Sequence, residues 1–270
     1  MKTLRPLFFF SSLLLIVGLA CSVLNGGDTP TQPEQPQQPV QEQPTQPPAP
    51  VVTEAPPTEA PATAAPTEAP VVSQTQQFFT EEFDTPLSGD WDILTVTGDS
   101  GADPDKVTVD ASDGKLVWDF ESKYVYYYLF YNAFTYEDVK VDVRADNRGK
   151  NNNSVSLICR YDPEIGWYEF NIANSGLYQI LYAEVTSDGS IDYNIVADGG
   201  STSINLGKDI NEYSISCKGQ QLTLYINGKE TKSVAEKKFN LREGQIGMSV
   251  SSFDVLPILI EMDWFKISEP

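Results

Sequence analysis

The amino-acid sequence predicts an all-β protein, a two-sheet antiparallel jelly-roll sandwich that follows a long segment unable to form a core. Three observations support this prediction. Polar and apolar residues alternate with period two after about residue 78, turn signals separate the alternating runs, and no stretch shows a helical period. We expect about 12 to 14 strands, which exceeds an immunoglobulin-like sandwich and favours a jelly roll.

The N-terminus has the features of an export signal. Lys2 and Arg5 precede an apolar run over residues 7–20 that is too short to span a bilayer. We therefore predict a signal peptide over residues 1–20. The sequence "VGLAC" ends at Cys21 and resembles the lipobox of bacterial lipoproteins, although Gly18 stands where that motif usually has leucine. Cys21 is predicted to carry a lipid on the outer face of a bacterial membrane, and secretion after ordinary cleavage is the alternative.

Residues 21–77 form a segment of a different character, rich in proline, threonine and glutamate, with "TEAPPTEAPATAAPTEAP" as a degenerate repeat. This composition cannot bury a core and is predicted to be disordered. An extended polyproline conformation would reach at most about 170 Å. We interpret the segment as a stalk.

Residues 78–270 are predicted to form one jelly-roll domain, which is long enough for a single well-buried core. Its expected turns are marked by Asp113-Gly114, Asp188-Gly189, Asp198-Gly199 and Asn227-Gly228. The expected strands include "KLVWDF", "DVKVDVRA", "SVSLICRY", "GWYEFNIA", "LYQILYAE", "EYSISCK", "QLTLYING", "QIGMSVS" and "ILIEMDWFKIS".

This domain also carries a family resemblance. The succession "ICRYDPEIGWYEFNIANSGLYQILYAE", "ISCKGQQLTLYINGKE", "LREGQIGMSVSSF" and "DWFKIS" resembles the concanavalin A-like jelly rolls, in their laminin-G-like and 3-keto-disaccharide hydrolase-like branch. With the signal, cysteine and stalk, the chain is similar to surface lipoproteins of Chloroflexi-type bacteria. The resemblance implies fold and compartment more strongly than activity, because this fold serves hydrolases, lectins and adhesive modules.

Two cysteines remain after Cys21. Cys159 alternates with Val155 and Leu157, and Cys217 alternates with Tyr213 and Ile215, so both fall on the apolar side of a strand. A disulfide between them is expected in an oxidising compartment, and two buried free thiols are the alternative.

The absence of histidine removes the usual catalytic triads and histidine-ligated zinc, which leaves carboxylates as catalytic groups. Jelly-roll glucanases carry Glu-x-Asp-x-Glu on one strand. The nearest approach here is "IEMDWFK", with Glu261 and Asp263 but no second glutamate, and Glu169 alternates with Trp167 and Asn171. We therefore predict no catalytic residue.

Metal binding is predicted by analogy with related jelly rolls, which often hold one calcium ion where the first and last strands meet. Glu82 or Asp84 and Asp263 supply hard oxygen ligands at those places. One structural calcium ion is the expected cofactor.

The net charge of the protein limits the classes of partner that it can bind. The chain has a net charge of −20, and removing the signal and stalk leaves 16 basic and 32 acidic residues, or −16, on the domain. Nucleic acid and anionic lipid are therefore disfavoured, and membrane contact is expected only through the lipid anchor.

The segment "SKYVYYYLFYNAF" over residues 122–134 is unusually aromatic. In a strand, alternate rings point to one face, where they could stack on sugars. The predicted ligand-binding residues are Tyr124, Tyr126, Tyr128, Arg160, Trp167 and Asn171. The leading hypothesis is a non-catalytic surface module that binds carbohydrate or another extracellular polymer. A glycoside hydrolase of keto-disaccharide or glucanase type, or a structural protein-binding envelope module, is the alternative.

Overall fold

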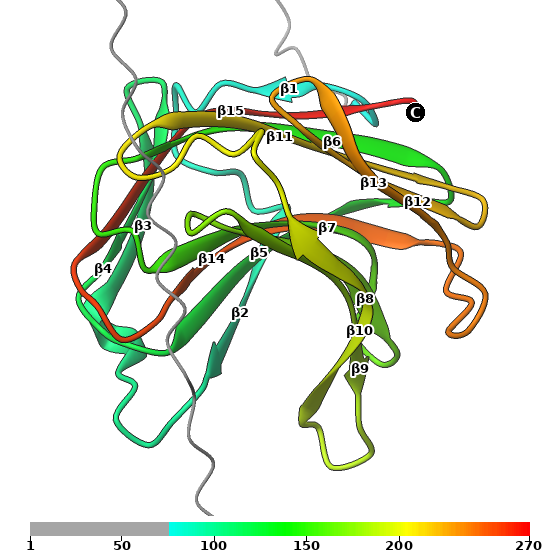
Figure 1. The fold of residues 1–270 in the computed structure, drawn as a ribbon, viewed down its shortest axis with the longest axis horizontal. Helices are drawn as coiled ribbons and strands as arrows, with labels where there is room; N and C mark the ends of the chain where they lie inside the picture. Colours follow the sequence, from blue (N-terminus) through cyan, green and yellow to red (C-terminus); the bar gives the residue numbers. More distant parts are fainter. Residues whose placement is uncertain (1–75) are drawn as a thin grey trace, which may run out of the picture. The chain divides into compact units, whose positions relative to one another are not determined.

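The computed structural model describes residues 76–270. They form fifteen β-strands and one short 3-10 helix, η1 (Pro104–Lys106). The strands build two antiparallel sheets that lie one above the other (Figure 1). The predicted all-β sandwich is therefore confirmed. None of the described residues belongs to a helix long and apolar enough to cross a lipid bilayer.

Sheet A has eight strands and carries the last strand of the chain. Seven of them follow the order β13 (Lys229–Ala235), β12 (Gln221–Ile226), β11 (Ile210–Lys218), β6 (Val139–Asn147), β15 (Ile258–Ser268), β4 (Lys115–Phe120) and β3 (Val107–Ser112). The short strand β1 (Thr80–Glu81) also pairs with β15, so the described domain begins and ends in sheet A.

Sheet B has seven strands and carries the aromatic segment. Their order is β10 (Ile191–Gly200), β9 (Leu177–Val185), β8 (Gly166–Ala173), β7 (Asn153–Asp162), β14 (Gly244–Ser252), β5 (Val125–Tyr136) and β2 (Trp91–Thr97). In Figure 1 both edges of this sheet, at β2 and at β9 and β10, bend away from sheet A. The outer face of sheet B is therefore concave.

The alternation of side chains on β5 explains how the two faces of sheet B differ. Val125, Leu129 and Tyr131 point inward and join the core between the sheets. Tyr128 and Phe130 point outward and belong to a second, smaller apolar cluster. Because strand side chains alternate between faces, one aromatic-rich strand supplies both the core and the concave surface.

Three of the four predicted turns are confirmed. Asp113-Gly114 and Asn227-Gly228 have positive φ at both positions, as a two-residue hairpin turn of type I′ requires, and Asp188-Gly189 joins β9 to β10. The predicted turn at Asp198-Gly199 is wrong, because both residues lie in β10. Asp198 pairs with Gln179 there, and the Tyr178 ring packs so closely on Gly199 that an added Cβ would lie 2.6 Å from its Oη.

The predicted disulfide between Cys159 and Cys217 is confirmed. Cys159 lies on β7 of sheet B and Cys217 on β11 of sheet A, and their Cα atoms are 6.6 Å apart. Both side chains are fully buried. The bridge therefore joins the two layers of the sandwich through its core.

Loss of this bridge is expected to destabilise the fold. In the chain-entropy model a link across 58 residues contributes about 4 kcal/mol. Urea unfolding of Cys159→Ala, Cys217→Ala and the double variant, followed by circular dichroism, measures the loss. Each single variant should lose about as much as the pair, because either removes the whole bridge. Wild-type stability in the double variant would contradict this prediction.

Candidate functional site

The concave face of sheet B carries a group of large aromatic side chains. Its buried members are Tyr128, Phe130, Ile158, Trp167 and Ala183. Tyr128 stacks parallel to Phe130 with ring centroids 5.8 Å apart, and both rings meet Trp167 edge-on. We call these five residues the outer cluster. It is a compact apolar layer on the face of the sheet that has no second sheet to cover it.

The outer cluster depends on the small side chains of β14. On this strand Gly247, Ser249 and Ser251 lie opposite the aromatic residues of β5. Phe130 of β5 and Tyr161 of β7, the strands on either side of β14, stack at 3.5 Å between centroids. A Cβ added to Gly247 would approach the Phe130 ring to 2.8 Å, so the stack requires glycine there.

Glu169 of β8 is an ionisable group within this aromatic layer, and only 2% of its surface is exposed. Its Oε1 accepts hydrogen bonds from Ser156 Oγ at 2.7 Å and from Asn171 Nδ2 at 3.4 Å. Its Oε2 accepts from Tyr128 Oη at 3.1 Å and from Trp167 Nε1 at 3.3 Å. Four donors from three strands therefore fix the position of the carboxyl group.

Burial raises the pKa of Glu169 above its ordinary value, although the four hydrogen bonds favour the charged form and draw the pKa partly back. A carboxyl group with a raised pKa keeps its proton to higher pH. Perturbed carboxyl groups of this kind occur at catalytic sites, where they serve as proton donors.

A groove runs along the concave face beside Glu169. One hollow of about 340 Å³ is lined by Tyr126, Tyr128, Glu169, Asn171, Gln179, Leu181, Tyr193, Ile195 and Phe253. A second, also about 340 Å³, is lined by Asn171, Ala173, Leu177, Tyr178, Gln179, Asp198, Gly199 and Phe253. Because the two share Asn171, Gln179 and Phe253, they form one groove over β8, β9 and β10.

Asp198 supplies a second carboxyl group to this groove. Strand register places Asp198 opposite Gln179, and Gln179 opposite Asn171, so all three share the outer face with Glu169. The Cα atoms of Glu169 and Asp198 would be about 12 Å apart in a flat sheet. They are separated by two strand spacings of about 4.8 Å across the sheet and by two residues of about 3.3 Å along the strands. Asp198 itself is exposed.

The predicted ligand-binding residues fall in different places. Tyr126, Tyr128 and Asn171 line the groove, and Trp167 lies in the outer cluster, fully buried. Tyr124 precedes β5 and has a positive φ of 55°. The structure thus brings four of the six predicted residues to the same face of sheet B.

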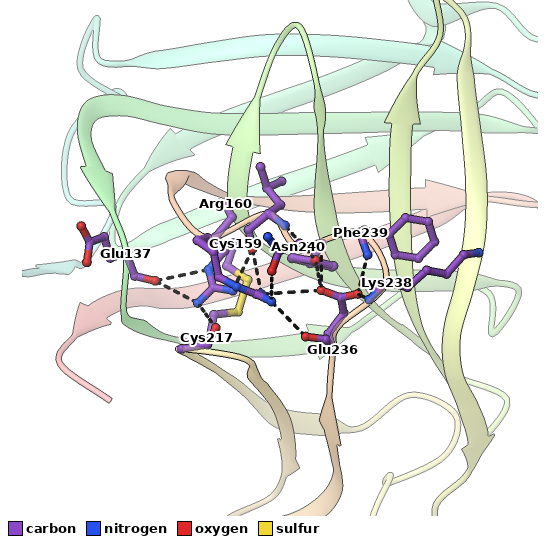
Figure 2. Close-up of polar contacts among 12 residues, drawn as sticks. Glu137, Cys159, Arg160, Cys217, Glu236, Lys238, Phe239 and Asn240 are labelled. Carbon is purple, nitrogen blue, oxygen red and sulfur yellow. Dashed lines mark hydrogen bonds and ion pairs between the residues drawn. A yellow bond between two sulfur atoms is a disulfide. The ribbon is translucent and has the colours of Figure 1, made fainter.

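Arg160 does not line the groove, contrary to the sequence-based placement. It has a positive φ of 57° at an irregularity in the pairing of β7, and its side chain is fully buried (Figure 2). Its guanidinium donates to the carbonyl oxygens of Glu137 at 3.0 Å, Leu241 at 3.0 Å and Gly219 at 2.8 Å. Arg160 therefore ties three loops together beside the disulfide.

The three predicted calcium ligands are not gathered into one site. Asp263 of β15 forms an ion pair with Arg144 of β6, and Glu82 and Asp84 lie just after β1, near the Gly114 turn. Among residues 76–270, no three carboxylate or cysteine side chains are grouped so that they could hold a metal ion. Calcium binding stays a prediction. Cys21, the signal peptide and nearly all of the stalk lie outside the described residues.

Sequence reasoning missed Tyr193, Gln179 and Phe253 as groove residues, and it gave Asp198 to a turn. Tyr193 and Gln179 lie on β10 and β9, and Phe253 directly follows β14. Phe253 also meets the Tyr126 ring edge-on at 6.5 Å. The alternation of "LYQILYAE" puts Gln179, Leu181 and Ala183 on one face, but it does not show which strand lies beside them.

Comparisons with known proteins identify the fold. No protein-family model matches the chain, and no curated protein sequence is significantly similar to it. One similar solved structure is a glycoside hydrolase family 16 endo-glucanase from Bacteroides ovatus in complex with G4G3G-2F-DNP. The two sequences are 14% identical, the TM-score is 0.52, and the match covers 70% of this chain and 99% of that one. Another is a family 16 protein of a Bacteroides ovatus mixed linkage glucan locus in complex with a G4G4G3G product. It is 13% identical to this chain with a TM-score of 0.51, and the match covers 70% of this chain and 99% of that one.

A third solved structure, described as a native glycosidic hydrolase, is 17% identical with a TM-score of 0.50, over 72% of this chain and 97% of that one. These similarities show the concanavalin A-like jelly-roll fold. The leading hypothesis of a non-catalytic binding module is corrected by these findings: the three similar structures are glycoside hydrolases, which favours the glucanase alternative.

Glu236 is a buried carboxyl group that lies beside Arg160, and its protonation affects the stability of the fold (Figure 2). Burial alone would raise its pKa, but hydrogen bonds from Tyr168 Oη and from the backbone N–H groups of Lys238, Phe239 and Asn240 outweigh burial and lower the pKa. The charged form therefore stabilises the fold above the unfolded-state pKa of about 4.3, and this contribution is lost as pH falls through the lower folded-state pKa.

We expect Glu236→Gln to cost about 1.5 to 3 kcal/mol at pH 7 and to lose less further stability than wild type on acidification. Urea unfolding at pH 7 and in a series below pH 4.3 measures both effects. Glu230→Gln, at an exposed position on β13, is the matched control and should follow wild type. Equal acid sensitivity in wild type and Glu236→Gln would show that Glu236 does not carry this pH dependence.

Proposed function

We propose that the chain is a glycoside hydrolase that cleaves a neutral polysaccharide in the groove of sheet B, with Glu169 as the source of the catalytic proton. One observation carries this proposal: a buried carboxyl group, held by four hydrogen bonds, stands at the wall of an aromatic-lined groove. Burial raises its pKa, as general acid catalysis near neutral pH requires.

The shape and chemistry of the groove suit a sugar chain. Tyr126 and Phe253 offer ring surface, and Asn171 and Gln179 offer amide groups that can read sugar hydroxyls. The domain's charge of −16 disfavours polyanionic glycans. We therefore propose a neutral glucan as substrate, and mixed linkage glucan is the first to test because it is named for one of the similar structures.

Asp198 is the proposed second carboxylate, acting as the base that activates water. Glycosidases that retain configuration hold their two carboxyl groups about 5 Å apart, and inverting enzymes hold them about 6.5 to 9.5 Å apart. Glucanases of the Glu-x-Asp-x-Glu type place the pair on one strand, but the matching positions after Glu169 are Asn171 and Ala173. The two strand spacings between Glu169 and Asp198 favour the wider, inverting arrangement.

We also propose that the lipid predicted at Cys21 holds this domain on the outer face of a bacterial membrane. The proposal rests on the signal-like residues 1–20 and on the proline-rich residues 21–77 that follow. A hydrolase attached in this way would act on polysaccharide outside the cell.

The first test is the release of reducing sugar from mixed linkage β-glucan by the full chain. Glu169→Gln should lower the rate by at least about 100-fold, because the glutamine cannot donate the catalytic proton. Asp198→Asn should cause a similar loss. Gln220→Glu, at an exposed position outside the groove, is the control and should retain wild-type activity. Undiminished activity of Glu169→Gln would contradict the assignment of Glu169.

The second test is the stereochemistry of the product. If Asp198 delivers water to the face opposite the leaving group, the first product from a β-linkage should be the α-anomer. Proton NMR during the first minutes of digestion distinguishes the two anomers before they equilibrate. A β-anomer as first product would rule out Asp198 as an inverting base and would leave hydrolysis itself established.

A further inference from the structure

Three oxygen atoms form a continuous chain from the buried carboxyl group of Glu169 to Tyr193. Tyr128 Oη lies 3.1 Å from Glu169 Oε2, and Tyr193 Oη lies 2.8 Å from Tyr128 Oη. The three residues come from β8, β5 and β10, which are not neighbouring strands. The aromatic side chains therefore reach across the concave face to meet at one point.

The exposed fraction of the three side chains differs sharply along this series of hydrogen bonds. Glu169 is 2% exposed and Tyr128 is fully buried, whereas Tyr193 is 40% exposed. A sugar in the groove can approach Tyr193 freely, but the Glu169 carboxyl is occupied on both oxygens by protein donors. A proton from Glu169 needs an intermediate group to reach a glycosidic oxygen.

Both hydroxyl groups are suited to pass on a proton. Burial is the main cause that raises the pKa of Tyr128 well above its ordinary value, and the neighbouring Glu169 charge adds to it. Burial and the Glu169 charge also raise the pKa of Tyr193. Because neither phenol ionises near neutral pH, each can accept a proton only by releasing its own at the same time.

We propose that Tyr128 and Tyr193 relay a proton from Glu169 to the groove, and that the Tyr193 hydroxyl is the group that contacts the glycosidic oxygen. This inference rests on the proposed function and adds to it the two residues through which the buried acid acts. Tyr193 is then a catalytic residue, and Tyr128 passes the proton between it and Glu169.

The relay balances as one concerted step. In the acid form of Glu169 the hydrogen bond between Oε2 and Tyr128 Oη runs in the opposite direction, with Oε2–H as the donor. Glu169 Oε2–H gives its proton to Tyr128 Oη, Tyr128 gives its own to Tyr193 Oη, and Tyr193 gives its own to the leaving oxygen. The bond from the anomeric carbon to that oxygen breaks, and the electron pair stays on the oxygen. Water forms the new bond to the anomeric carbon and loses a proton to Asp198. One water is consumed, and proton exchange with solvent restores both carboxyl groups.

The nature of the leaving group separates a proton relay from a structural role. Cleavage of mixed linkage β-glucan needs a proton on the leaving oxygen, whereas a 2,4-dinitrophenyl β-cellotrioside releases a stable phenolate without one. Tyr193→Phe in the full chain should lower kcat on the glucan at least about 100-fold and leave KM nearly unchanged. The same variant should cleave the dinitrophenyl substrate at close to the wild-type rate.

Tyr225→Phe is the matched control, because Tyr225 is a half-buried tyrosine on β12 of sheet A and does not line the groove. It should behave as wild type on both substrates, and thermal unfolding should show that all variants are folded. Tyr128→Phe should repeat the substrate-dependent loss of Tyr193→Phe.

Three different results would overturn the relay. If Glu169→Gln is inactive on the glucan while Tyr193→Phe keeps the wild-type rate, the relay is wrong and the proposed function stands. If Tyr193→Phe loses activity equally on both substrates, the hydroxyl has a structural role. A wild-type chain that cleaves neither substrate would overturn the proposed function and the relay together.

Discussion

The low side-chain volume on the outer face of β14 is the constraint on which the site depends. Gly247 leaves room for Phe130 and Tyr161 to stack above the strand, and Ser249 lies between Tyr128 and Ser156. Rings from β5 can therefore lie across the sheet rather than stand upright from it. This orientation brings the Tyr128 hydroxyl to Glu169, three strands away, and gives the buried carboxyl group a partner that water would otherwise have to supply.

The fold was largely predictable, because alternation and turn chemistry are local properties of the chain. Both faces of β5 and the disulfide follow from period-two spacing and from cysteines on apolar sides of strands. The site was less predictable, because it depends on which strands become neighbours. Tyr193 meets Tyr128 only through the order of sheet B. Arg160 was misplaced because an irregularity in β7 breaks the alternation after Cys159.

Burial acts differently on two buried carboxyl groups of the domain, Glu236 and Glu169. Around Glu236, backbone N–H groups and a tyrosine stabilise the charge, and the pKa falls. Around Glu169, burial among aromatic rings outweighs four donors, and the pKa rises. The first arrangement secures a loop at the end of the sandwich, and the second leaves a carboxyl group with a raised pKa beside a groove. The two carboxyl groups accept similar numbers of hydrogen bonds, but their pKa values shift in opposite directions because their apolar surroundings differ.

The pairing of β1 with β15 places both ends of the described domain in sheet A, whereas the groove lies on the outer face of sheet B. Attachments at either end therefore leave the groove unobstructed. For protein engineering, the domain suits display from either end on a bead or a cell. The closeness of the two ends also makes it a candidate for circular permutation, with new termini opened in a hairpin of sheet A, such as that between β3 and β4.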